Sequence, residues 1–331
     1  MKRQSVSLLI LISVLTLPSC SNNGTRVVRK QLFFRMDTMV EITISVPPRY
    51  NHAPLWRSID SLLSQCERRF SATGDSSEIN AVNTRTSNAL PVSIPLGEML
   101  RQGTAYGDTL GGAFDISVLP LKELWGLCER CGDSVPIPDS AAVSVTLQSV
   151  NYKKIRVNDI GDSVFFDTPS TRVDVGGIAK GFIIKWLGAL MTVHGAGDFL
   201  ISAGGDIISS GRRPDGAPWR VGVRHPRRPD ELVAAIPAES GAVFTSGDYE
   251  RMRQTGDGRR YHHIFDPATG FPCGGNQSLT IRTPDPVRAD ILSTGLFCRE
   301  AESIINFIDA RSDLECLVID SAGGIFKSSG W

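Results

Sequence analysis

The chain has 331 residues, enough for one large domain or two smaller ones, and its 35 basic residues equal its 35 acidic residues. This balance excludes an overall electrostatic field that attracts nucleic acid, so we expect no nucleic-acid partner. A hydrophobic content of 41% is ordinary for a globular protein and excludes extensive disorder.

The first twenty residues have the pattern of an export signal. Lys2 and Arg3 precede an apolar run over residues 6–17, which is too short to span a bilayer but has the length of a signal-peptide core. The run ends in the segment Leu17-Pro18-Ser19-Cys20, which resembles the lipobox of bacterial lipoproteins. An ordinary secretory signal with an incidental cysteine is the alternative interpretation.

We therefore expect residues 1–19 to be a signal peptide and Cys20 to carry the lipid. Residues 20–30 are polar and are expected to form a tether, with the folded domain over residues 31–331. This organisation predicts an exported protein that is anchored to a bacterial membrane through its lipid and faces the periplasm.

Strands and helices are predicted in alternation along the first half of the domain. The stretches Gln31–Arg35 and Met39–Val46 alternate in polarity as strands do. Apolar residues then recur at three- and four-residue steps from Trp56 to Phe70, which predicts an amphipathic helix. Pro95 suits the first turn of a further helix, and the pair Gly111-Gly112 ends it.

The second half is richer in short strands. Strand-like pieces at Lys154–Val157 and Val164–Asp167 lead into Thr171–Val175, which we expect to be a strand that ends in two glycines before a helix. Short strands and Gly/Pro turns fill Phe199–Thr283, and a helix is predicted over Val287–Cys298. The mixture lacks a regular βαβ rhythm, so we expect an α+β fold in a single large mixed domain.

Six cysteines follow Cys20, which permits disulfides in an exported protein without fixing any pairing. Cys128 and Cys131 form a C-x-x-C pair, the spacing of redox sites and of half a zinc site. Because no second pair or neighbouring histidine accompanies it, a short-loop disulfide or two free thiols is the favoured interpretation.

The usual nucleotide and hydrolase fingerprints are missing from the sequence. There is no Walker A loop, no GxGxxG motif that opens a helix, no HExxH and no GxSxG. Any nucleotide that this protein binds must be held by other motifs.

The first candidate motif is the run from Asp174 to Gly181, Asp-Val-Gly-Gly-Ile-Ala-Lys-Gly. Two glycines before a helix bring backbone N–H groups and the positive helix end to a place that a ligand can approach closely. Lys180 adds a cation for phosphate oxygens, and Asp174 is placed to reach a ribityl or ribose hydroxyl. The alternative is a tight turn whose glycines serve only packing.

The second candidate motif carries oxygen ligands for a metal ion. On the predicted helix, Asp290 and Thr294 are four residues apart and share a face, and their oxygens suit Mg²⁺ or Ca²⁺ better than zinc. A carbonyl such as that of Gly177 is able to complete the set. The alternative is an aspartate favoured by the helix dipole with an incidental threonine.

The third motif combines Thr245–Arg251 with Tyr261–Pro272, which contains His262 and His263 beside an Asp-Pro turn. In a strand the two imidazoles face opposite ways, so at most one serves the site as a base. The alternative is one buried, hydrogen-bonded histidine and one that faces solvent.

Taken in order, these motifs closely resemble the ApbE family of FAD:protein FMN transferases. The resemblance covers residues 36–296, nearly the whole mature chain. It includes these further segments: Phe70-Ser71, Ser77–Asn80, Gly112–Asp115, Pro120-Leu121, Leu124–Gly126, Ala203–Ile207 and Gly216–Val223. It implies a T-fold-like mixed domain around a central cleft for FAD and Mg²⁺.

The resemblance also implies roles for individual residues. The metal ligands match the Gly177 carbonyl, Asp290 and Thr294, with Mg²⁺ on the FAD pyrophosphate, and the catalytic base matches His263. Contacts to the flavin nucleotide match Met36, Ala113, Phe114, Asp115, Asp174, Lys180 and, through its backbone, Ile264. The family transfers FMN from FAD to a Thr or Ser hydroxyl of an acceptor and releases AMP. Its acceptors include subunits of ion-pumping quinone and ferredoxin oxidoreductases.

The sequence departs from the family pattern at two places. The chain has Met36-Asp37-Thr38 where the family often has Met-Gly-Thr. Thr73 replaces a tyrosine that stacks on the flavin, so we expect it beside FAD but with weaker retention of the nucleotide. Mg²⁺-dependent hydrolysis of FAD to FMN and AMP is the nearest alternative function. A non-catalytic flavin-binding lipoprotein is a third, which the presence of Asp290, Thr294 and His263 speaks against.

Overall fold

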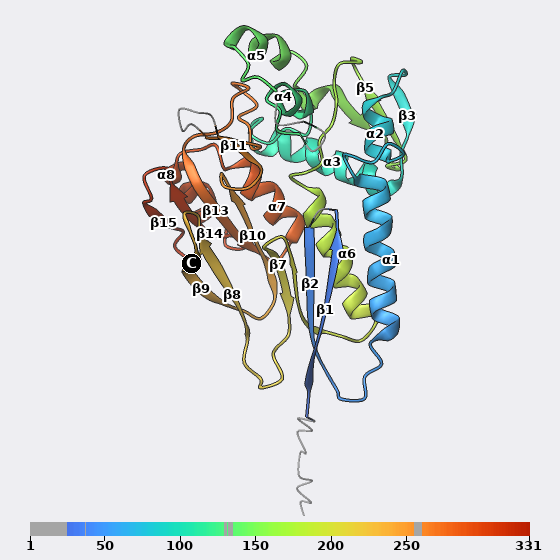
Figure 1. Cartoon of the computed structure of the whole chain (residues 1–331), viewed down its shortest axis with the longest axis vertical. Helices are drawn as coiled ribbons and strands as arrows, with labels where there is room; N and C mark the ends of the chain where they lie inside the picture. Colours follow the sequence, from blue (N-terminus) through green and yellow to red (C-terminus); the bar gives the residue numbers. More distant parts are fainter. Residues whose placement is uncertain (1–24, 37, 129–130, 132–134, 255–259) are drawn as a thin grey trace, which may run out of the picture.

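An eight-stranded antiparallel sheet runs through the protein, as the computed structural model shows in Figure 1. The structure describes residues 25–36, 38–128, 131, 135–254 and 260–331. In spatial order the strands are β1 (Val27–Arg35), β2 (Thr38–Val46), β6 (Asp198–Ala203), β7 (Asp206–Ser210), β10 (Gly241–Gly247), β13 (Asn276–Thr283), β14 (Glu315–Asp320) and β15 (Ile325–Lys327). Both predicted strands at the start of the domain are present.

Strand β1 begins earlier than the sequence suggested. Val27 pairs with Val46 of β2, so residues 27–30, which we expected in the tether, belong to the sheet. Arg29 and Lys30 are exposed because β1 is an edge strand, and charged side chains on an edge strand discourage pairing with other chains. Their polarity made a strand look like a tether.

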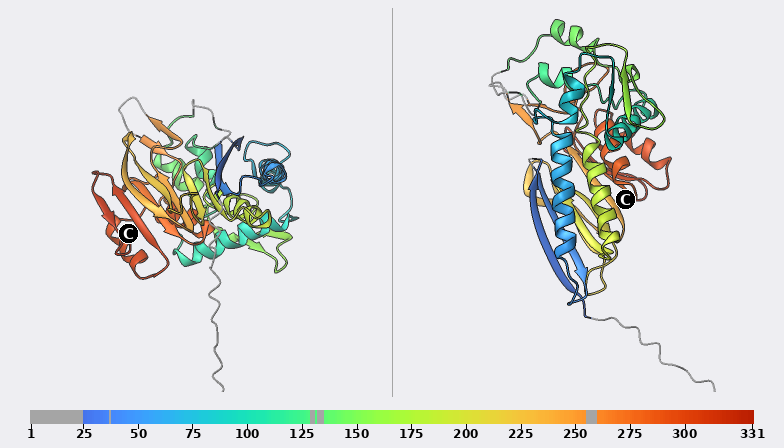
Figure 2. Two further views of the ribbon diagram at one scale, coloured as in Figure 1. Left: turned by 90° about the horizontal axis from the view of Figure 1, so that it is seen from below. Right: turned by 90° about the vertical axis from the view of Figure 1, so that its right-hand side faces the viewer.

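The sheet is covered on both faces. Val243 and Phe244 are neighbours in β10 and therefore point to opposite faces. Phe244 belongs to the main core, which holds the buried sides of α6 (Ala179–Val193) and α7 (Pro286–Gly295). Val243 packs instead against the hairpin of β8 (Trp219–His225) and β9 (Arg228–Ala238). The domain therefore has three layers, with the hairpin on one side and the helices on the other (Figures 1 and 2).

Helix α1 (Ala53–Phe70) lies along α6 and β1 and carries the predicted apolar stripe. Its side chains at Leu55, Ile59 and Leu63 are fully buried, at the four-residue spacing of one helix face. Helix α8 (Ala301–Asp309) packs beside β14 near the end of the chain. Figure 2 shows α1 and α6 side by side from a second direction.

A second group of elements covers one end of the sheet (Figure 1), and two of its helices contribute residues to the cavity described below. The helices are α2 (Glu78–Asn83), α3 (Ile94–Thr109), α4 (Leu119–Leu124), α5 (Ser140–Leu147) and a 3₁₀ turn (Tyr152–Lys154). The strands are β3 (Ala89–Pro91), β4 (Ile155–Val157) and β5 (Ser163–Phe166) in one sheet, and β11 (Met252–Gln254) and β12 (Arg260–His262) in another. The α+β class is confirmed.

The predicted strand at Thr171–Val175 is wrong. The backbone N–H and carbonyl groups of this extended segment bond to a side chain and to a carbonyl of a turn, and not to a neighbouring strand. The Asn83 side chain accepts from the Val173 N–H at 2.7 Å and donates to the Val173 carbonyl at 2.8 Å. The Asp174 N–H donates to the Ile116 carbonyl at 2.7 Å. An extended segment that is anchored in this way looks like a strand in sequence, because its apolar residues still alternate.

Four of the cysteines form two disulfides, Cys128–Cys131 and Cys273–Cys298, while Cys66 and Cys316 are buried free thiols. Of the two states favoured for the C-x-x-C pair, a short-loop disulfide or two free thiols, the structure has the disulfide. None of the helices in the described part of the chain is long and apolar enough to cross a membrane.

Candidate active site

A cavity of about 660 Å³ gathers nearly all of the predicted site residues. Its walls come from the β1–β2 junction, the turn before α6, the end of β10, the segment after β12 and one face of α7. The predicted residues that line it are Met36, Ala113, Phe114, Asp115, Asp174, Gly177, Lys180, His263, Ile264, Asp290 and Thr294. Residues spread over more than 250 positions of sequence thus share one hollow.

Thr73 is not brought to the cavity. Its side chain is exposed and lies 3.0 Å from the Ser71 hydroxyl, while Ser71 and Ala72 line the wall in its place. A role for Thr73 beside the flavin is therefore not supported by its position. Cys20 and Asp37 lie outside the described residues.

Helices α6 and α7 approach each other closely at the floor of the cavity. A Cβ added to Gly181 would lie 2.7 Å from both the Pro286 carbonyl oxygen and the Val287 Cα, so only glycine fits there. The close approach lets the Gly181 N–H donate to the Asp290 carboxylate at 2.8 Å. The first turn of α6 thereby orients the carboxylate that α7 supplies.

Asp290 is 3% exposed, and burial raises its pKa to about 7, although the charge of Lys180 opposes that rise. A buried carboxylate of this kind gains most from a cation. Thr294 lies one turn further along α7, 3.5 Å from the Ser246 hydroxyl. Gly177 is its neighbour, because a Cβ on Gly177 would be 3.3 Å from Thr294 Oγ1. The three predicted ligands therefore come together.

The chemistry of this set fits a hard divalent cation. A carboxylate, a hydroxyl and a nearby backbone carbonyl offer oxygen only, which Mg²⁺ prefers and zinc does not. Within the described residues, no three His, Cys, Asp or Glu side chains cluster as metal ligands. A small number of protein oxygens is typical of Mg²⁺ sites, in which phosphate and water complete the coordination.

Lys180 forms an ion pair with Asp206, a residue to which the sequence gave no role. Asp206 is 2% exposed and also accepts from the Thr245 N–H at 3.0 Å. Burial lowers the pKa of the Lys180 ammonium, but the charges of Asp206 and Asp290 outweigh burial and raise it. Lys180 therefore stays charged between two carboxylates. The signal for Asp206 was its place in the Ala203–Ile207 match.

A second pair, Lys122 with Asp174, lines the same cavity and was also missed as a pair. The ammonium of Lys122 is 2.9 Å from Asp174 Oδ2, and Asp174 Oδ1 accepts from the Gly176 N–H at 2.7 Å. Burial alone would raise the pKa of Asp174. The charge of Lys122 and these hydrogen bonds lower that pKa by more than burial raises it, so the carboxylate is ionised. Asp174 is thus fixed beside the glycine turn.

His263 is held as a neutral imidazole with one nitrogen free. Its Nδ1 lies 3.1 Å from the Glu250 carbonyl oxygen. A carbonyl only accepts, so Nδ1 carries the proton and Nε2 keeps its lone pair. Burial, followed by the charge of Lys122, lowers the pKa of His263 to about 3. The ring lines the cavity and is ready to accept a proton there.

His262 has the opposite environment. It is 2% exposed, its Nε2–H donates to the Cys273 carbonyl at 2.7 Å, and its Nδ1 accepts from the Ile264 N–H at 3.3 Å. Its ring contacts Phe297 edge-on at 5.6 Å between centroids. Both nitrogens are occupied, so His262 holds the loop in place. The expected division of roles between the two histidines agrees with these contacts.

Three other residues predicted to contact the flavin nucleotide also make contacts that stabilise the fold. Both carboxylate oxygens of Asp115 already accept hydrogen bonds within the protein, from Ser117 on one oxygen and from the Tyr152 N–H on the other. Met36 has a positive φ of 54°, and its N–H donates to Glu67 at 2.8 Å. Phe114 is 5% exposed and packs against the Gly177 turn. These residues shape the wall as well as line it.

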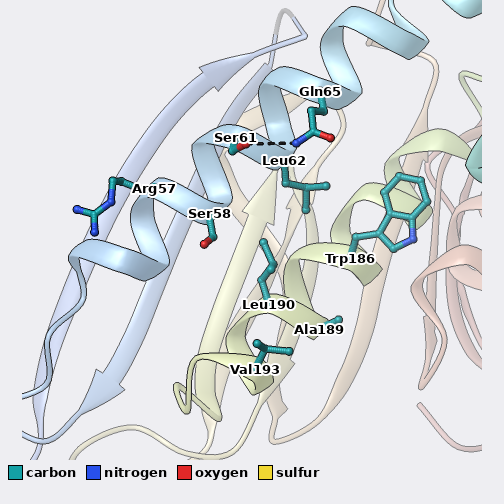
Figure 3. A pocket seen from close by; sticks show the side chains of 9 residues that line it. All are labelled: Arg57, Ser58, Ser61, Leu62, Gln65, Trp186, Ala189, Leu190 and Val193. Carbon is teal, nitrogen blue, oxygen red and sulfur yellow. Dashed lines mark hydrogen bonds between the residues drawn. The ribbon is translucent and has the colours of Figure 1, made fainter.

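A shallow groove of about 550 Å³ between α1 and α6 is separate from this cavity and shares no residue with it (Figure 3). Ser61 and Gln65 bond to each other across one turn of α1. The groove is lined by Arg57, Ser58, Ser61, Leu62, Gln65, Trp186, Ala189, Leu190 and Val193. It holds no carboxylate or histidine, so the chemistry belongs to the cavity.

An enclosed hollow with an oxygen-ligand set, a charged lysine and a neutral histidine defines an enzyme that acts on a phosphorylated ligand. The model of the ApbE family matches residues 36–318, and the chain belongs to that family.

Curated relatives are named FAD:protein FMN transferase. The protein of Salmonella typhimurium is 30% identical over 263 residues, which cover 77% of this chain and 73% of the relative. That of Vibrio cholerae is 30% identical over 275 residues, covering 82% and 80%. Among solved structures, the ApbE protein of Thermotoga maritima has a TM-score of 0.84 and 28% identity, covering 92% of this chain and 97% of its own. The flavin transferase ApbE of Vibrio cholerae has a TM-score of 0.82 and 26% identity, covering 92% and 98%.

Proposed function

We propose that this protein transfers FMN from FAD to a Thr or Ser hydroxyl of an acceptor protein, releases AMP and depends on Mg²⁺. The observation that carries the proposal is the pairing, in one cavity, of a neutral His263 with the oxygen set of Gly177, Asp290 and Thr294. The curated relatives carry the name of this activity, which supports it further.

Gly177, Asp290 and Thr294 would hold Mg²⁺. When bound, the ion would neutralise charge on the pyrophosphate of FAD. Lys180 is the second residue of α6 and lines the cavity, where its ammonium would favour an anion. Lys180 and His263 line the same cavity, which supports a position for the phosphate of the FMN half within reach of both.

His263 performs the proton transfer. Its Nε2 accepts the proton of the acceptor hydroxyl, whose oxygen then bonds to the phosphorus of the FMN half. The bond from that phosphorus to the AMP phosphate breaks, and AMP leaves. The Glu250 carbonyl keeps the proton on Nδ1, so Nε2 is the nitrogen that is available as the base. The negative pyrophosphate raises the proton affinity of His263 when FAD is present.

The acceptor is a flavoprotein of the same compartment, and subunits of ion-pumping quinone or ferredoxin oxidoreductases are the class to try first. The test is an incubation of the protein with FAD, Mg²⁺ and such a subunit, followed by mass spectrometry of the acceptor. We expect covalent FMN on one Thr or Ser, and none in EDTA or with the His263→Ala variant. If only free FMN forms with several acceptors at high concentration, the reaction is hydrolysis of FAD and not transfer.

We also propose that the protein is exported and lipidated at Cys20. The apolar run over residues 6–17 and the lipobox-like segment support this location, and so do the two disulfides, which form in oxidising compartments. Metabolic labelling with a fatty-acid analogue should mark the wild type and not the Cys20→Ser variant. Equal labelling of both proteins would overturn the lipid assignment.

A further inference from the structure

The Cys273–Cys298 disulfide joins two segments that the proposed reaction needs at a fixed separation. The two cysteines are 25 residues apart in sequence, with a Cα–Cα distance of 5.1 Å. Cys298 lies three residues after the end of α7, the helix that carries Asp290 and Thr294. Cys273 lies in the chain that returns past the residues after His263, and its N–H donates to the Ile264 carbonyl at 3.0 Å.

The same two segments are tied together by non-covalent contacts. The Cys273 carbonyl accepts from His262 Nε2–H at 2.7 Å, and His262 stands edge-on against Phe297, the residue before Cys298. The Asn276 side-chain amide donates to the Phe297 carbonyl at 2.7 Å and to the Arg299 carbonyl at 2.8 Å. The His262 ring therefore links the two segments, since its Nδ1 accepts from the Ile264 N–H while its Nε2–H and its ring face contact Cys273 and Phe297.

We propose that the Cys273–Cys298 disulfide is a positioning element of catalysis, which fixes the His263 segment against helix α7. The disulfide itself lies outside the cavity lining, so it acts through the backbone of residues 262–264. This inference rests on the proposed function, because it assigns a purpose to the fixed distance between the base and the α7 ligands.

The physical reason is that His263 has little else to hold it. His263 directly follows β12, and within the described part of the chain its ring has one hydrogen-bond partner, the Glu250 carbonyl. Proton transfer needs the base within hydrogen-bond reach of the hydroxyl. A misplacement of about 1 Å is enough to cost roughly a hundredfold in rate. A covalent link close behind the base limits that displacement.

The test compares the full wild-type protein with the Cys273→Ser/Cys298→Ser double variant under oxidising conditions. We expect kcat for FMN transfer to fall at least about tenfold, with KM for FAD changed less than about twofold, since the nucleotide-binding turn is untouched. Dithiothreitol should have the same effect on the wild type. Each disulfide takes two electrons and two protons from the reductant, which becomes a cyclic disulfide.

Two controls separate positioning from general stability. The Cys316→Ala variant removes a buried thiol from β14 and should lower the free energy of unfolding without lowering kcat at 25 °C. Dithiothreitol also reduces Cys128–Cys131, and Cys128 lines the cavity, so adding dithiothreitol to the double variant measures the effect of that second disulfide on kcat separately. Amide hydrogen exchange should be faster at Ile264 and Cys273 in the double variant than in the wild type, whatever the activity.

A double variant with wild-type kcat and unchanged exchange at Ile264 and Cys273 would overturn the inference. The inference would also be overturned if the double variant and Cys316→Ala lost equal stability and their kcat values fell by the same factor. Failure of the proposed function looks different, because the oxidised wild type would then form neither protein-bound FMN nor AMP. In that case the exchange measurement still decides whether the disulfide orders the His263 segment.

Discussion

Replacing Gly181 with alanine tests how the two helices present Asp290 to the cavity. The new Cβ would lie 2.7 Å from the Pro286 oxygen and the Val287 Cα, well inside the ordinary contact distance. Both atoms are backbone, so the helices must separate. Overpacking of this kind costs about 1–3 kcal/mol, while alanine in place of glycine returns about 1 kcal/mol of helix propensity. We expect a net loss of up to about 2 kcal/mol in the free energy of unfolding.

Gly188 is a matched control in the same helix. A Cβ there would lie 3.5 Å from Ile208 and 3.7 Å from Phe199, which is ordinary contact. Gly188→Ala should therefore stabilise the protein by up to about 1 kcal/mol. Urea unfolding of both variants measures the difference, and magnesium titration should show weaker binding only in Gly181→Ala. Equal stability of the two variants would refute the close approach of α6 and α7.

The remaining predictions concern charge and protonation. His263→Ala should lower kcat about a hundredfold or more, whereas His262→Ala should mainly lower stability; the reverse pattern in steady-state kinetics would mean that the roles are exchanged. Asp290→Asn should abolish Mg²⁺-dependent turnover with an unchanged circular dichroism spectrum, and full activity in EDTA would contradict the ligand role. Lys180→Met removes the ion-pair partner of the buried Asp206; because the Lys180 side chain is 38% exposed, urea unfolding should show a loss of about 1–3 kcal/mol, and a loss below about 0.5 kcal/mol would count against the ion pair. Burial lowers the pKa of both histidines, that of His263 to about 3. The unfolded chain then binds protons that the folded chain does not. The contribution of the two histidines to stability should therefore be complete above about pH 7 and be lost as the pH drops below about 6.5, so the wild type should lose more stability than His263→Ala over that range.

Local patterns predicted much of the fold. The apolar stripe of α1 and the alternation of β2 follow from side-chain spacing alone, and both are present. The segment Thr171–Val175 shows the limit of that reasoning. Its extended backbone is satisfied by Asn83, a residue about 90 positions away, and no local pattern records such a partner. The start of β1 was missed because its exposed edge carries charge.

The motifs predicted the candidate site. They did not predict which charged groups would pair with each other. Lys180 was expected as a phosphate ligand, but its pairing with Asp206 depends on the meeting of α6 with β7. The position of Thr73 likewise depends on how the chain turns after α1, where the Ser71 hydroxyl draws the loop onto itself. Long-range packing decides the Lys180–Asp206 contact, and sequence spacing does not encode it.

The fate of the FMN half of FAD is measured most directly by counting two products in one reaction. The protein is incubated with FAD, Mg²⁺ and an acceptor subunit, and AMP and acceptor-bound FMN are quantified over time. We predict that they rise together in equal amounts, because each hydroxyl that His263 deprotonates displaces one AMP. AMP that rises while the acceptor stays free of flavin would contradict transfer to a protein.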